Sequence, residues 1–340
     1  MNNISIILFG YGNIGKAFHQ RLLKQKQVIQ KKYKAKFHFD LILRSSSYLM
    51  GDKWVDSKDT LNVFKKFIKK SPNKKYLIVD CTASKEMYNL YLEIKDIDAC
   101  VIAANKVPLS LSHNKYMDLM SHLTKENIFY FYEATVGAGL PVVKPFIDLL
   151  DSGDEIKEVV GSFSGTLTYL FSDSKLPFSK RIQNAYDMAY TEPDPRIDLS
   201  GLDVARKCLV LARLMGLNLS LEDIEIENLV PESLRDIELD EFFNRLDECD
   251  KKIQEKEENA FKLNKSLCYM GKIFQSGIKV GLFEVEQTSS FYGLKGTSNL
   301  IEICSNFYPE GYLIKGPGAG VDVTVCGLIS DIFKGLIILK

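Results

Sequence analysis

Five side chains that could bind charge or transfer protons lie close together in the segment TEPDPRIDLSGLDVARK, residues 191–207. They are Glu192, Asp194, Asp198, Asp203 and Lys207. Clustered acids suit a substrate with an ammonium group, and a lysine can donate a proton to an oxygen that gains electrons during hydride transfer. Pro193 and Pro195 restrict the backbone that carries the acids, which reduces the entropy lost when the turn is ordered. The segment therefore has the residue types of an active site for a small charged substrate.

The same residues also fit a purely structural role. Ser200 and Asp203 match the capping-box pattern at the start of an expected helix over residues 200–215. Asp203 and Lys207 are four residues apart, so they share one helical face and would pair with each other. The local pattern alone favours this structural interpretation.

A glycine-rich signature near the N-terminus points to a nucleotide. In FGYGNIGKAF, Gly10, Gly12 and Gly15 follow an apolar strand over residues 4–9 and open a helix over residues 14–26. The first glycine permits a tight turn, the second lets the pyrophosphate approach the backbone, and the third allows close helix–strand packing. The helix N-terminus offers N–H groups to the phosphates. This context predicts dinucleotide binding rather than an incidental βα turn.

The end of the second strand bears on which dinucleotide is bound. A carboxylate there would bind the ribose 2′-hydroxyl of NAD, whereas Arg44 followed by three serines suits the 2′-phosphate of NADP. NADP is therefore favoured, although a surface arginine at a strand end is a common alternative. Arg44→Asp should shift the preference toward NAD. Thr82, in VDCTAS after a later strand, is placed at the ligand crevice, and Cys81 beside it is interpreted as a packing residue.

Two further segments follow strands of the same sheet. VIAANKVPLS would bring Lys106 out at the carboxyl edge, near the expected nicotinamide, although a solvated loop lysine fits the pattern as well. YEATVGAGLPVV is a glycine-rich connector whose carbonyl groups could hold a cation or a ligand, and it also suits a hinge between domains.

The elements around these candidates indicate an α/β protein with two domains. Short apolar strands alternate with amphipathic helices over the first 130 residues, which is typical of a mostly parallel sheet. Beyond Glu155, strands and long helices at irregular spacing suggest an α+β domain. We expect a dinucleotide-binding domain over residues 1–145, completed by 314–340, and a substrate-binding and oligomerisation domain over 146–313.

The composition excludes several classes of function. The 44 Lys and Arg residues balance the 44 Asp and Glu residues, so no overall charge points to nucleic acid or to a membrane surface. The seven cysteines include no CxxC pair and are typical of reduced thiols. No signal-peptide or membrane-span pattern is present, so a cytoplasmic location is expected.

Six motifs occur in the order typical of one family. They are GYGNIG, VIAANK, YEATVGAGLP, GSFSGTLTYLF, TEPDPRIDLSGLDVARK and GPGAG. Over essentially the whole chain this series resembles homoserine dehydrogenase. The resemblance implies NAD(P)-dependent interconversion of L-homoserine and L-aspartate 4-semialdehyde, a step toward threonine, methionine and isoleucine. It implies a Rossmann-type domain and a homodimer or homotetramer formed through the second domain.

The resemblance also implies roles for individual residues. Lys207 matches the catalytic lysine that protonates the alkoxide, and Lys106 matches a second lysine near nicotinamide and substrate. Glu192 and Asp203 match residues that bind homoserine, and Asp198 is an additional acid near the substrate amino group. The residues that match cofactor contacts are the phosphate loop Gly12, Asn13, Ile14 and Gly15, and the late loop ending at Gly320. The residues that match ligands of a monovalent cation, expected to be sodium, are Glu133, Val136, Ala138 and Leu140, which would bind it through their backbone oxygens. Ser164 stands where many members carry asparagine.

Two alternatives remain open from the sequence. One is a dehydrogenase of another small amino acid or semialdehyde, and the other is a non-catalytic dinucleotide sensor. Neither an amino-terminal kinase region nor a carboxyl-terminal ACT domain, which needs ~60 residues, is expected, so threonine feedback through such a domain is not expected either.

Overall fold

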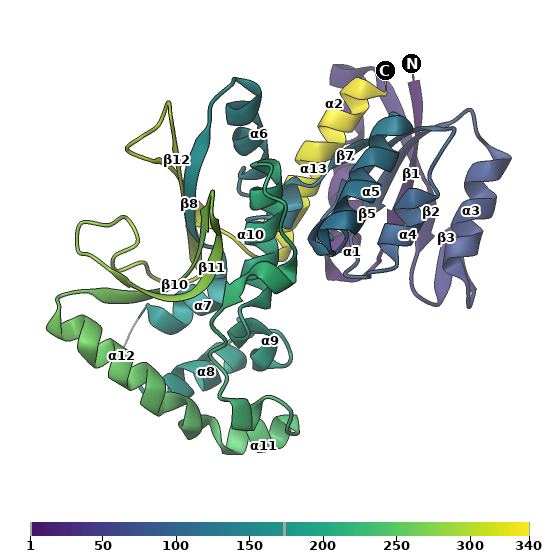
Figure 1. The fold of residues 1–340 in the computed structure, drawn as a ribbon. Helices are drawn as coiled ribbons and strands as arrows, with labels where there is room; N and C mark the ends of the chain where they lie inside the picture. The colour runs from purple at the N-terminus through teal and green to yellow at the C-terminus, as the bar shows by residue number, and fades with distance from the viewer. Residues whose placement is uncertain (1, 173–174, 340) are drawn as a thin grey trace. The chain divides into compact units, whose positions relative to one another are not determined.

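The computed structural model describes residues 2–172 and 175–339, which form two compact units (Figure 1). Unit 1 consists of Met1–Val143 and Gly320–Lys340, and unit 2 consists of Lys144–Ala319. Unit 1 is therefore built from both ends of the chain, because its last helix follows unit 2 in sequence. Among the described residues, no helix combines the length and the apolar composition needed to span a bilayer.

The centre of unit 1 is a seven-stranded sheet in the order β4-β3-β2-β1-β5-β6-β7. Five of its strands are parallel: β1 (Asn2–Phe9), β2 (Ala35–Leu43), β5 (Lys75–Asp80), β6 (Asp98–Ala103) and β7 (Phe129–Phe131). The other two, β3 (Ser47–Met50) and β4 (Lys53–Asp56), form an antiparallel hairpin at one edge. The strands β1, β5 and β6 are nearly continuous apolar runs, as expected when both faces of a sheet are covered.

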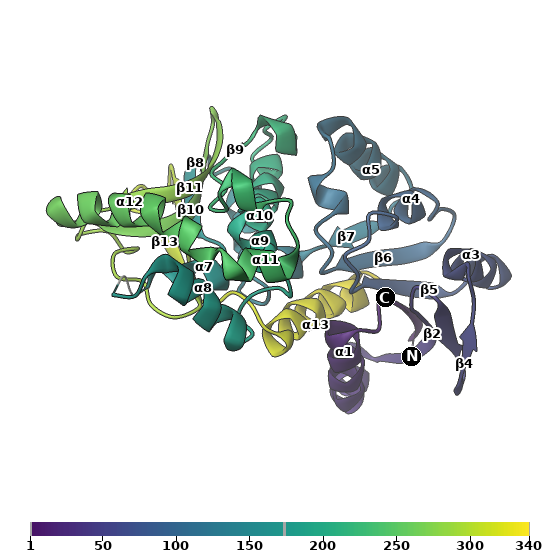
Figure 2. The same cartoon turned by 90° about the horizontal axis from the view of Figure 1, so that it is seen from below.

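Helices cover both faces of this sheet (Figure 2). One face packs against α1 (Asn13–Lys24), α2 (Lys26–Tyr33) and α13 (Val321–Ile338). The other face packs against α3 (Thr60–Lys70), α4 (Met87–Leu92) and α5 (His113–Lys125). Each helix turns an apolar stripe to the sheet, such as Phe64 and Ile68 of α3.

The order of the sheet reverses at β1, which lies between β2 and β5. In open α/β sheets, ligands bind outside the carboxyl ends of the strands at such a switch point. The loops that follow β1, β5 and β6 carry Gly12, Thr82 and Lys106, respectively. The expected Rossmann-type fold of this unit is confirmed.

Unit 2 is an α+β unit with a six-stranded sheet in the order β13-β12-β8-β10-β11-β9. Its strands are β8 (Ile156–Ser162), β9 (Glu225–Ile226), β10 (Ser266–Phe274), β11 (Gly277–Val285), β12 (Ser298–Ser305) and β13 (Tyr312–Pro317). Its helices are α6 (from Val143 to Asp151), α7 (Gly165–Phe171), α8 (Phe178–Asp187), α9 (Pro195–Leu199), α10 (Leu202–Leu214), α11 (Leu239–Asn244) and α12 (Asp250–Lys262). The helices α7, α10 and α12 all contact β10.

A 3-10 turn at Leu246–Cys249 separates α11 from α12. One detail of the expected secondary structure is wrong. The helix expected from Ser200 begins at Leu202, and Ser200 instead terminates the short helix α9.

Candidate active site

Lys207 is the most buried cationic side chain of residues 191–207. It lies on α10 and is only 9% exposed. Its Nζ donates to the carbonyl oxygen of Phe163 at 2.7 Å and is 2.8 Å from Oδ2 of Asp203. The predicted pairing of Asp203 with Lys207 is confirmed. An ammonium held by one carbonyl and one carboxylate, with little access to water, is fixed in direction and well suited to deliver a proton.

Two glycines allow α10 and the strand ends to approach closely enough for this contact. A Cβ at Gly271 of β10 would lie 2.1 Å from the Sγ of Cys208, the neighbour of Lys207. A Cβ at Gly161 of β8 would lie 2.5 Å from the ring of Phe163, whose carbonyl receives the lysine. Side chains at either position would therefore displace the helix or the carbonyl that hold the ammonium.

The start of α10 is not a capping box. Its N-cap is Gly201, with φ of 74°, and the Oγ of Ser200 accepts the N–H of Leu202, the first residue of the helix, at 3.2 Å. A Cβ at Gly201 would lie 2.0 Å from the hydroxyl oxygen of Tyr269, which donates to the carbonyl of Glu227. The close approach of Tyr269 and the left-handed backbone both require glycine here. As a result, Gly201 and not Ser200 occupies the N-cap position, and the Asp203 carboxylate pairs with Lys207.

Asp198 lies on α9 and organises the preceding turn. Its Oδ2 accepts the backbone N–H of Glu192 at 2.8 Å. The Thr166 hydroxyl reaches both the Asp198 carboxyl group and the carbonyl oxygen of Tyr190, the latter at 2.5 Å. Burial is the main cause that raises the pKa of Asp198 to about 6, and the charges of Glu192 and Asp203 add to it. The three acids predicted to bind substrate therefore lie near one another in unit 2.

Asp194 has a different role from the other acids. Its side chain accepts the backbone N–H of Arg196 at 3.0 Å and caps α9. The guanidinium of Arg196 pairs with the same carboxylate at 2.8 Å, and this bond holds the pKa of Asp194 below its usual range. Asp194 is therefore a structural residue of the turn.

The glycine loop of unit 1 has the geometry that the sequence predicts. A Cβ at Gly10, where φ is 84°, would lie 2.8 Å from the carbonyl oxygen of Cys81, and a Cβ at Gly15 would lie 1.9 Å from the Gly10 carbonyl oxygen. A Cβ at Gly12 would meet no atom within 4 Å. Gly12 is also the N-cap of α1, which has no side-chain cap. The fold itself therefore needs Gly10 and Gly15, whereas Gly12 borders open space beside the helix N-terminus, where a phosphate group fits.

Arg44 follows β2 and lies beside aromatic rings. Its guanidinium is 3.9 Å from the ring centroid of Trp54 and 5.4 Å from that of Tyr11. Stacking uses the flat face of the guanidinium, so its in-plane N–H groups point outward. Arg44 lines a cavity of about 390 Å³ that Gly10, Thr82 and Lys58 also line. The sequence reasoning missed Lys58, which is a single lysine in an exposed loop.

Lys106 is half-buried and lies in the loop after β6. Its neighbour Asn105 is 2% exposed and bonds to the loop that carries Thr82, with 3.2 Å between the Asn105 Nδ2 and the Thr82 Oγ1. Burial raises the pKa of the Cys81 thiol well above its usual value, so Cys81 is not a thiolate nucleophile.

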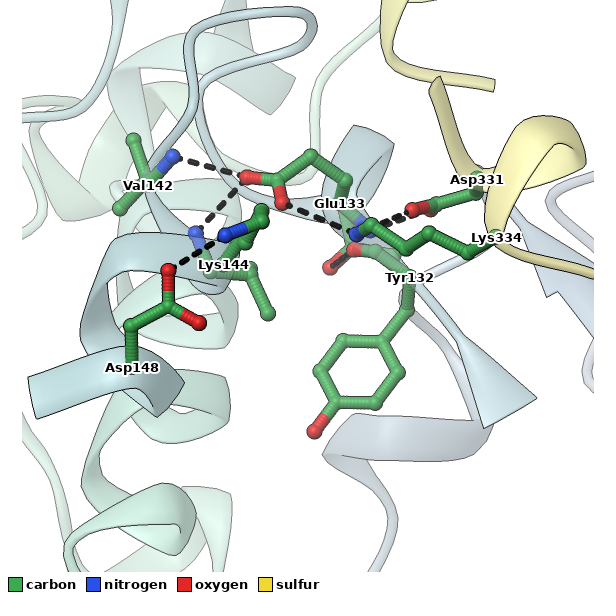
Figure 3. Close-up of polar contacts among 9 residues, drawn as sticks. Tyr132, Glu133, Val142, Lys144, Asp148, Asp331 and Lys334 are labelled. Atoms are coloured by element: carbon green, nitrogen blue, oxygen red, sulfur yellow. Dashed lines mark hydrogen bonds and ion pairs between the residues drawn. The ribbon is translucent and has the colours of Figure 1, made fainter. Parts of the chain in front are cut away.

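Glu133 of the glycine-rich connector forms a charge cluster within unit 1 with two residues of α13 (Figure 3). The Oε1 of Glu133 accepts the N–H groups of Val142 and Val143 at 2.8 and 2.9 Å, and the Glu133 N–H donates to Oδ2 of Asp331 on α13 at 2.9 Å. The Nζ of Lys334 is 2.7 Å from Asp331 and 3.7 Å from Glu133. Burial raises the pKa of Asp331.

The backbone of this connector then turns sharply, with left-handed φ values at Gly137 and Ala138 of 75° and 55°. Of its predicted cation ligands, Glu133, Val136 and Ala138 are buried. Within residues 2–172 and 175–339, no group of three or more His, Cys, Asp or Glu side chains is arranged to hold a metal ion. The predicted cation site consists of backbone oxygens and would not include such a group of side chains.

Comparison with known proteins identifies the family. The model of the homoserine dehydrogenase family matches residues 141–333. Homoserine dehydrogenase of Saccharomyces cerevisiae is 32% identical over 351 residues, which cover 97% of each chain. The chain belongs to the homoserine dehydrogenase family. Bifunctional aspartokinase/homoserine dehydrogenase 2 of Escherichia coli is also 32% identical, over 97% of this chain. The chain spans 38–43% of the length of the first bifunctional relatives that it matches.

Solved structures share the fold of this homoserine dehydrogenase family member. A Candida auris protein described as of unknown function has a TM-score of 0.86 at 28% identity, with 98% of each chain covered. A hyperthermophilic archaeal homoserine dehydrogenase in complex with NADPH has a TM-score of 0.68 at 20% identity, covering 98% of this chain and 97% of its own.

The predicted site residues fall into two groups. Glu192, Asp198, Asp203 and Lys207 lie together in unit 2, whereas Lys106, Arg44, the glycine loop and the connector belong to unit 1. Gly320, predicted to contact the cofactor, is the N-cap of α13 in unit 1. Ser164, the position that departs from the family pattern, caps α7 by accepting the Leu167 N–H. The sequence reasoning missed Thr166, although it lies in the quoted motif GSFSGT.

Proposed function

We propose that this protein is an NAD(P)-dependent homoserine dehydrogenase, which interconverts L-homoserine and L-aspartate 4-semialdehyde. The observation that carries the proposal is the enclosed Lys207 ammonium, held by Asp203 and the Phe163 carbonyl beside two further acids. Family membership supports the same reaction. By the family's chemistry, the protein would act in threonine, methionine and isoleucine biosynthesis.

The residues of unit 2 would divide the work on the substrate. Glu192 and Asp203 bind homoserine, and Asp198 adds negative charge near its amino group while it fixes the Glu192 turn. The dinucleotide, when bound, supplies a hydride to the aldehyde carbon. Lys207 then donates a proton from its ammonium to the oxygen that gains the electron pair, and in the reverse direction the neutral amine removes the proton from the alcohol. Asp203 and the Phe163 carbonyl keep the Nζ aimed at that oxygen.

The cofactor that we propose is NADP, with NAD as the alternative. Gly12 and the uncapped α1 N-terminus would receive the pyrophosphate, with Gly10, Asn13, Ile14 and Gly15 completing the loop. The in-plane donors of Arg44 would bind the 2′-phosphate, and Lys58 lines the same cavity. The NADPH complex of the archaeal relative supports a nicotinamide dinucleotide.

A monovalent cation, which we propose to be sodium, would bind the connector through the backbone oxygens of Glu133, Val136, Ala138 and Leu140. The carboxylate of Glu133 on this connector and that of Asp331 beside it both pair with the ammonium of Lys334. The left-handed Gly137–Ala138 turn also redirects successive carbonyl groups. We further propose a cytoplasmic enzyme that forms a homodimer or homotetramer through unit 2, which light scattering after gel filtration would measure.

The decisive experiment is a turnover assay. The protein is mixed with homoserine and NADP, and separately with NAD, at alkaline pH, and nicotinamide absorbance is followed. Aspartate and other small amino acids or semialdehydes serve as competing substrates. Cofactor binding without substrate-dependent reduction would indicate a sensor instead. Lys207→Ala should abolish turnover while nucleotide binding survives.

The single tryptophan gives an independent reading of the cofactor. Because Trp54 stacks on Arg44, a bound 2′-phosphate should change its fluorescence. Arg44→Asp should weaken NADP binding while NAD turnover persists, and calorimetric titration measures this because the variant lacks the side chain that stacks on Trp54. Unchanged cofactor preference in this variant would remove Arg44 from the proposal.

A further inference from the structure

A buried carboxylate lies at the carboxyl end of β5, beneath the loops that follow β5 and β6. Asp80 is 0% exposed. Its Oδ2 accepts the Tyr91 hydroxyl at 2.6 Å and the Asn105 amide at 3.0 Å, and its Oδ1 accepts the Thr82 N–H at 2.8 Å. The donors come from α4, from the loop after β6 and from the loop after β5. Asp80 is therefore a common anchor for three segments.

Asn105 connects these segments more directly than any single bond of Asp80. Its Nδ2 lies 3.0 Å from Asp80 Oδ2, 3.2 Å from Thr82 Oγ1 and 2.9 Å from the Ser84 carbonyl oxygen. Its Oδ1 accepts the N–H of Val107 at 3.0 Å. The side chain of Asn105 thus fixes the backbone on both sides of Lys106 and ties it to the Thr82 loop.

The Thr82 loop in turn packs on the glycine loop. The N–H of Cys81 donates to the carbonyl of Phe9 at 2.8 Å, and a Cβ at Gly10 would lie only 2.8 Å from the Cys81 carbonyl oxygen. A shift of the glycine loop would therefore move the backbone that Asn105 holds. The contacts form one continuous series from the glycine loop to Lys106, and all of them lie within unit 1.

We propose that Asn105 is a positioning residue that couples the dinucleotide loops to Lys106. The inference rests on the proposed function. Asparagine is the side chain that this place requires, because it supplies two N–H donors and one acceptor on a short stem. An aspartate would face the Asp80 carboxylate with a second negative charge, and an alanine would leave Asp80 and the Ser84 carbonyl each without one donor.

The test compares Asn105→Ala with Tyr91→Phe. The control removes a donor from the same Asp80 but leaves the link between the loops. Asn105→Ser, which keeps one hydroxyl donor, is the milder variant if the alanine variant does not fold. We expect Asn105→Ala to lower kcat/KM for homoserine 10- to 100-fold and Tyr91→Phe to lower it less than 5-fold.

A double-mutant cycle decides whether Asn105 acts through Lys106. In a Lys106→Met background, Asn105→Ala should cost less than 3-fold further, because the group that it positions is already gone. The proposal would be overturned if the double variant lost activity by the product of the two single losses. Normal turnover of Asn105→Ala would also overturn it. Normal turnover of Lys106→Met alongside a loss in Asn105→Ala would overturn it too.

Hydrogen–deuterium exchange gives a reading that does not depend on turnover. Adding NADPH should slow exchange in residues 104–107 of the unmodified protein and of Tyr91→Phe, but not of Asn105→Ala or Asn105→Ser. Residues 10–15 should be protected in all of them. If the unmodified protein binds NADPH but does not oxidise homoserine, the proposed function fails, but the exchange experiment still tests the coupling through Asn105. Equal protection of residues 104–107 in every variant would refute that coupling.

Discussion

The ion pair between Lys207 and Asp203 predicts an asymmetry between the two possible ways of breaking it. The side chain of Lys207 is 11% exposed, whereas that of Asp203 is 43% exposed. In Lys207→Met, the remaining Asp203 carboxylate is already in contact with water and the buried stem keeps its packing, but the Phe163 carbonyl loses a donor. The expected loss in the free energy of unfolding is therefore about 1–2 kcal/mol.

Asp203→Asn leaves the buried ammonium of Lys207 without its carboxylate partner. The ammonium keeps the Phe163 carbonyl as a partner but has little access to water. Removing one partner of a fully buried pair costs about 3–5 kcal/mol. Because Asp203 is partly exposed, we expect a smaller loss of about 2–3 kcal/mol, which is still larger than for Lys207→Met.

Activity should follow the opposite order. Lys207→Met removes the proton donor and should lower kcat by about 10²–10⁴-fold. Asp203→Asn keeps the ammonium and should mainly raise KM for homoserine. Urea unfolding followed by circular dichroism measures stability, and nicotinamide absorbance measures turnover. A Lys207→Met protein within 10-fold of normal kcat, or one less stable than Asp203→Asn, would refute the reasoning.

Three other predictions concern the remaining charges and the glycine loop. The folded-state pKa of Asp198, about 6, lies above its ordinary value of 3.8. The contribution of Asp198 to the free energy of unfolding is therefore least favourable above pH 6, where the carboxylate is charged, and improves as the pH falls from 6 toward 3.8. Asp198→Asn should therefore be as stable as or more stable than the unmodified protein at pH 8 but not at pH 4, as measured by thermal unfolding at both values; equal differences at both would contradict this. Gly12→Ala should keep normal stability and lose NADPH binding, whereas Gly10→Ala should lose about 1–2 kcal/mol of stability or more, by urea unfolding; matched stability losses would contradict it. Asp331→Asn should reduce the rise in unfolding temperature that NaCl gives over choline chloride, while Lys334→Met should increase it, and salt responses that do not change would argue against the connector as the cation site.

The parts of the molecule that the sequence predicted are those encoded locally. Gly10, Gly12 and Gly15 lie within one βα turn, and Asp203 and Lys207 lie within one helical turn, so spacing alone determines their relation. The hairpin of β3 and β4 was not predicted because all four residues of β4 are exposed and give no apolar alternation. Its prediction would have required knowing that Trp54 stacks on Arg44.

The contacts that the sequence did not predict join segments far apart in the chain. Thr166 reaches Asp198 from a separate helix, and Asn105 reaches back to Asp80 and Ser84 from another strand end. The capping-box prediction failed for the same reason. Tyr269, from β10, occupies the space beside Gly201, so a tertiary contact and not the local pattern determines where α10 begins.

The four acids of residues 191–207 differ in whether a cation pairs with them. Asp194 is neutralised by Arg196, and Asp203 by Lys207. Among the described residues, Glu192 and Asp198 take part in no ion pair, and the charge of Glu192 helps to raise the pKa of Asp198. The Asp198 carboxylate fixes the turn through the Glu192 N–H, but that bond does not need the side-chain charge of Glu192 nearby. An arriving ammonium group would relieve the repulsion between the two acids and lower the pKa of Asp198, as expected if the proposed substrate binds here.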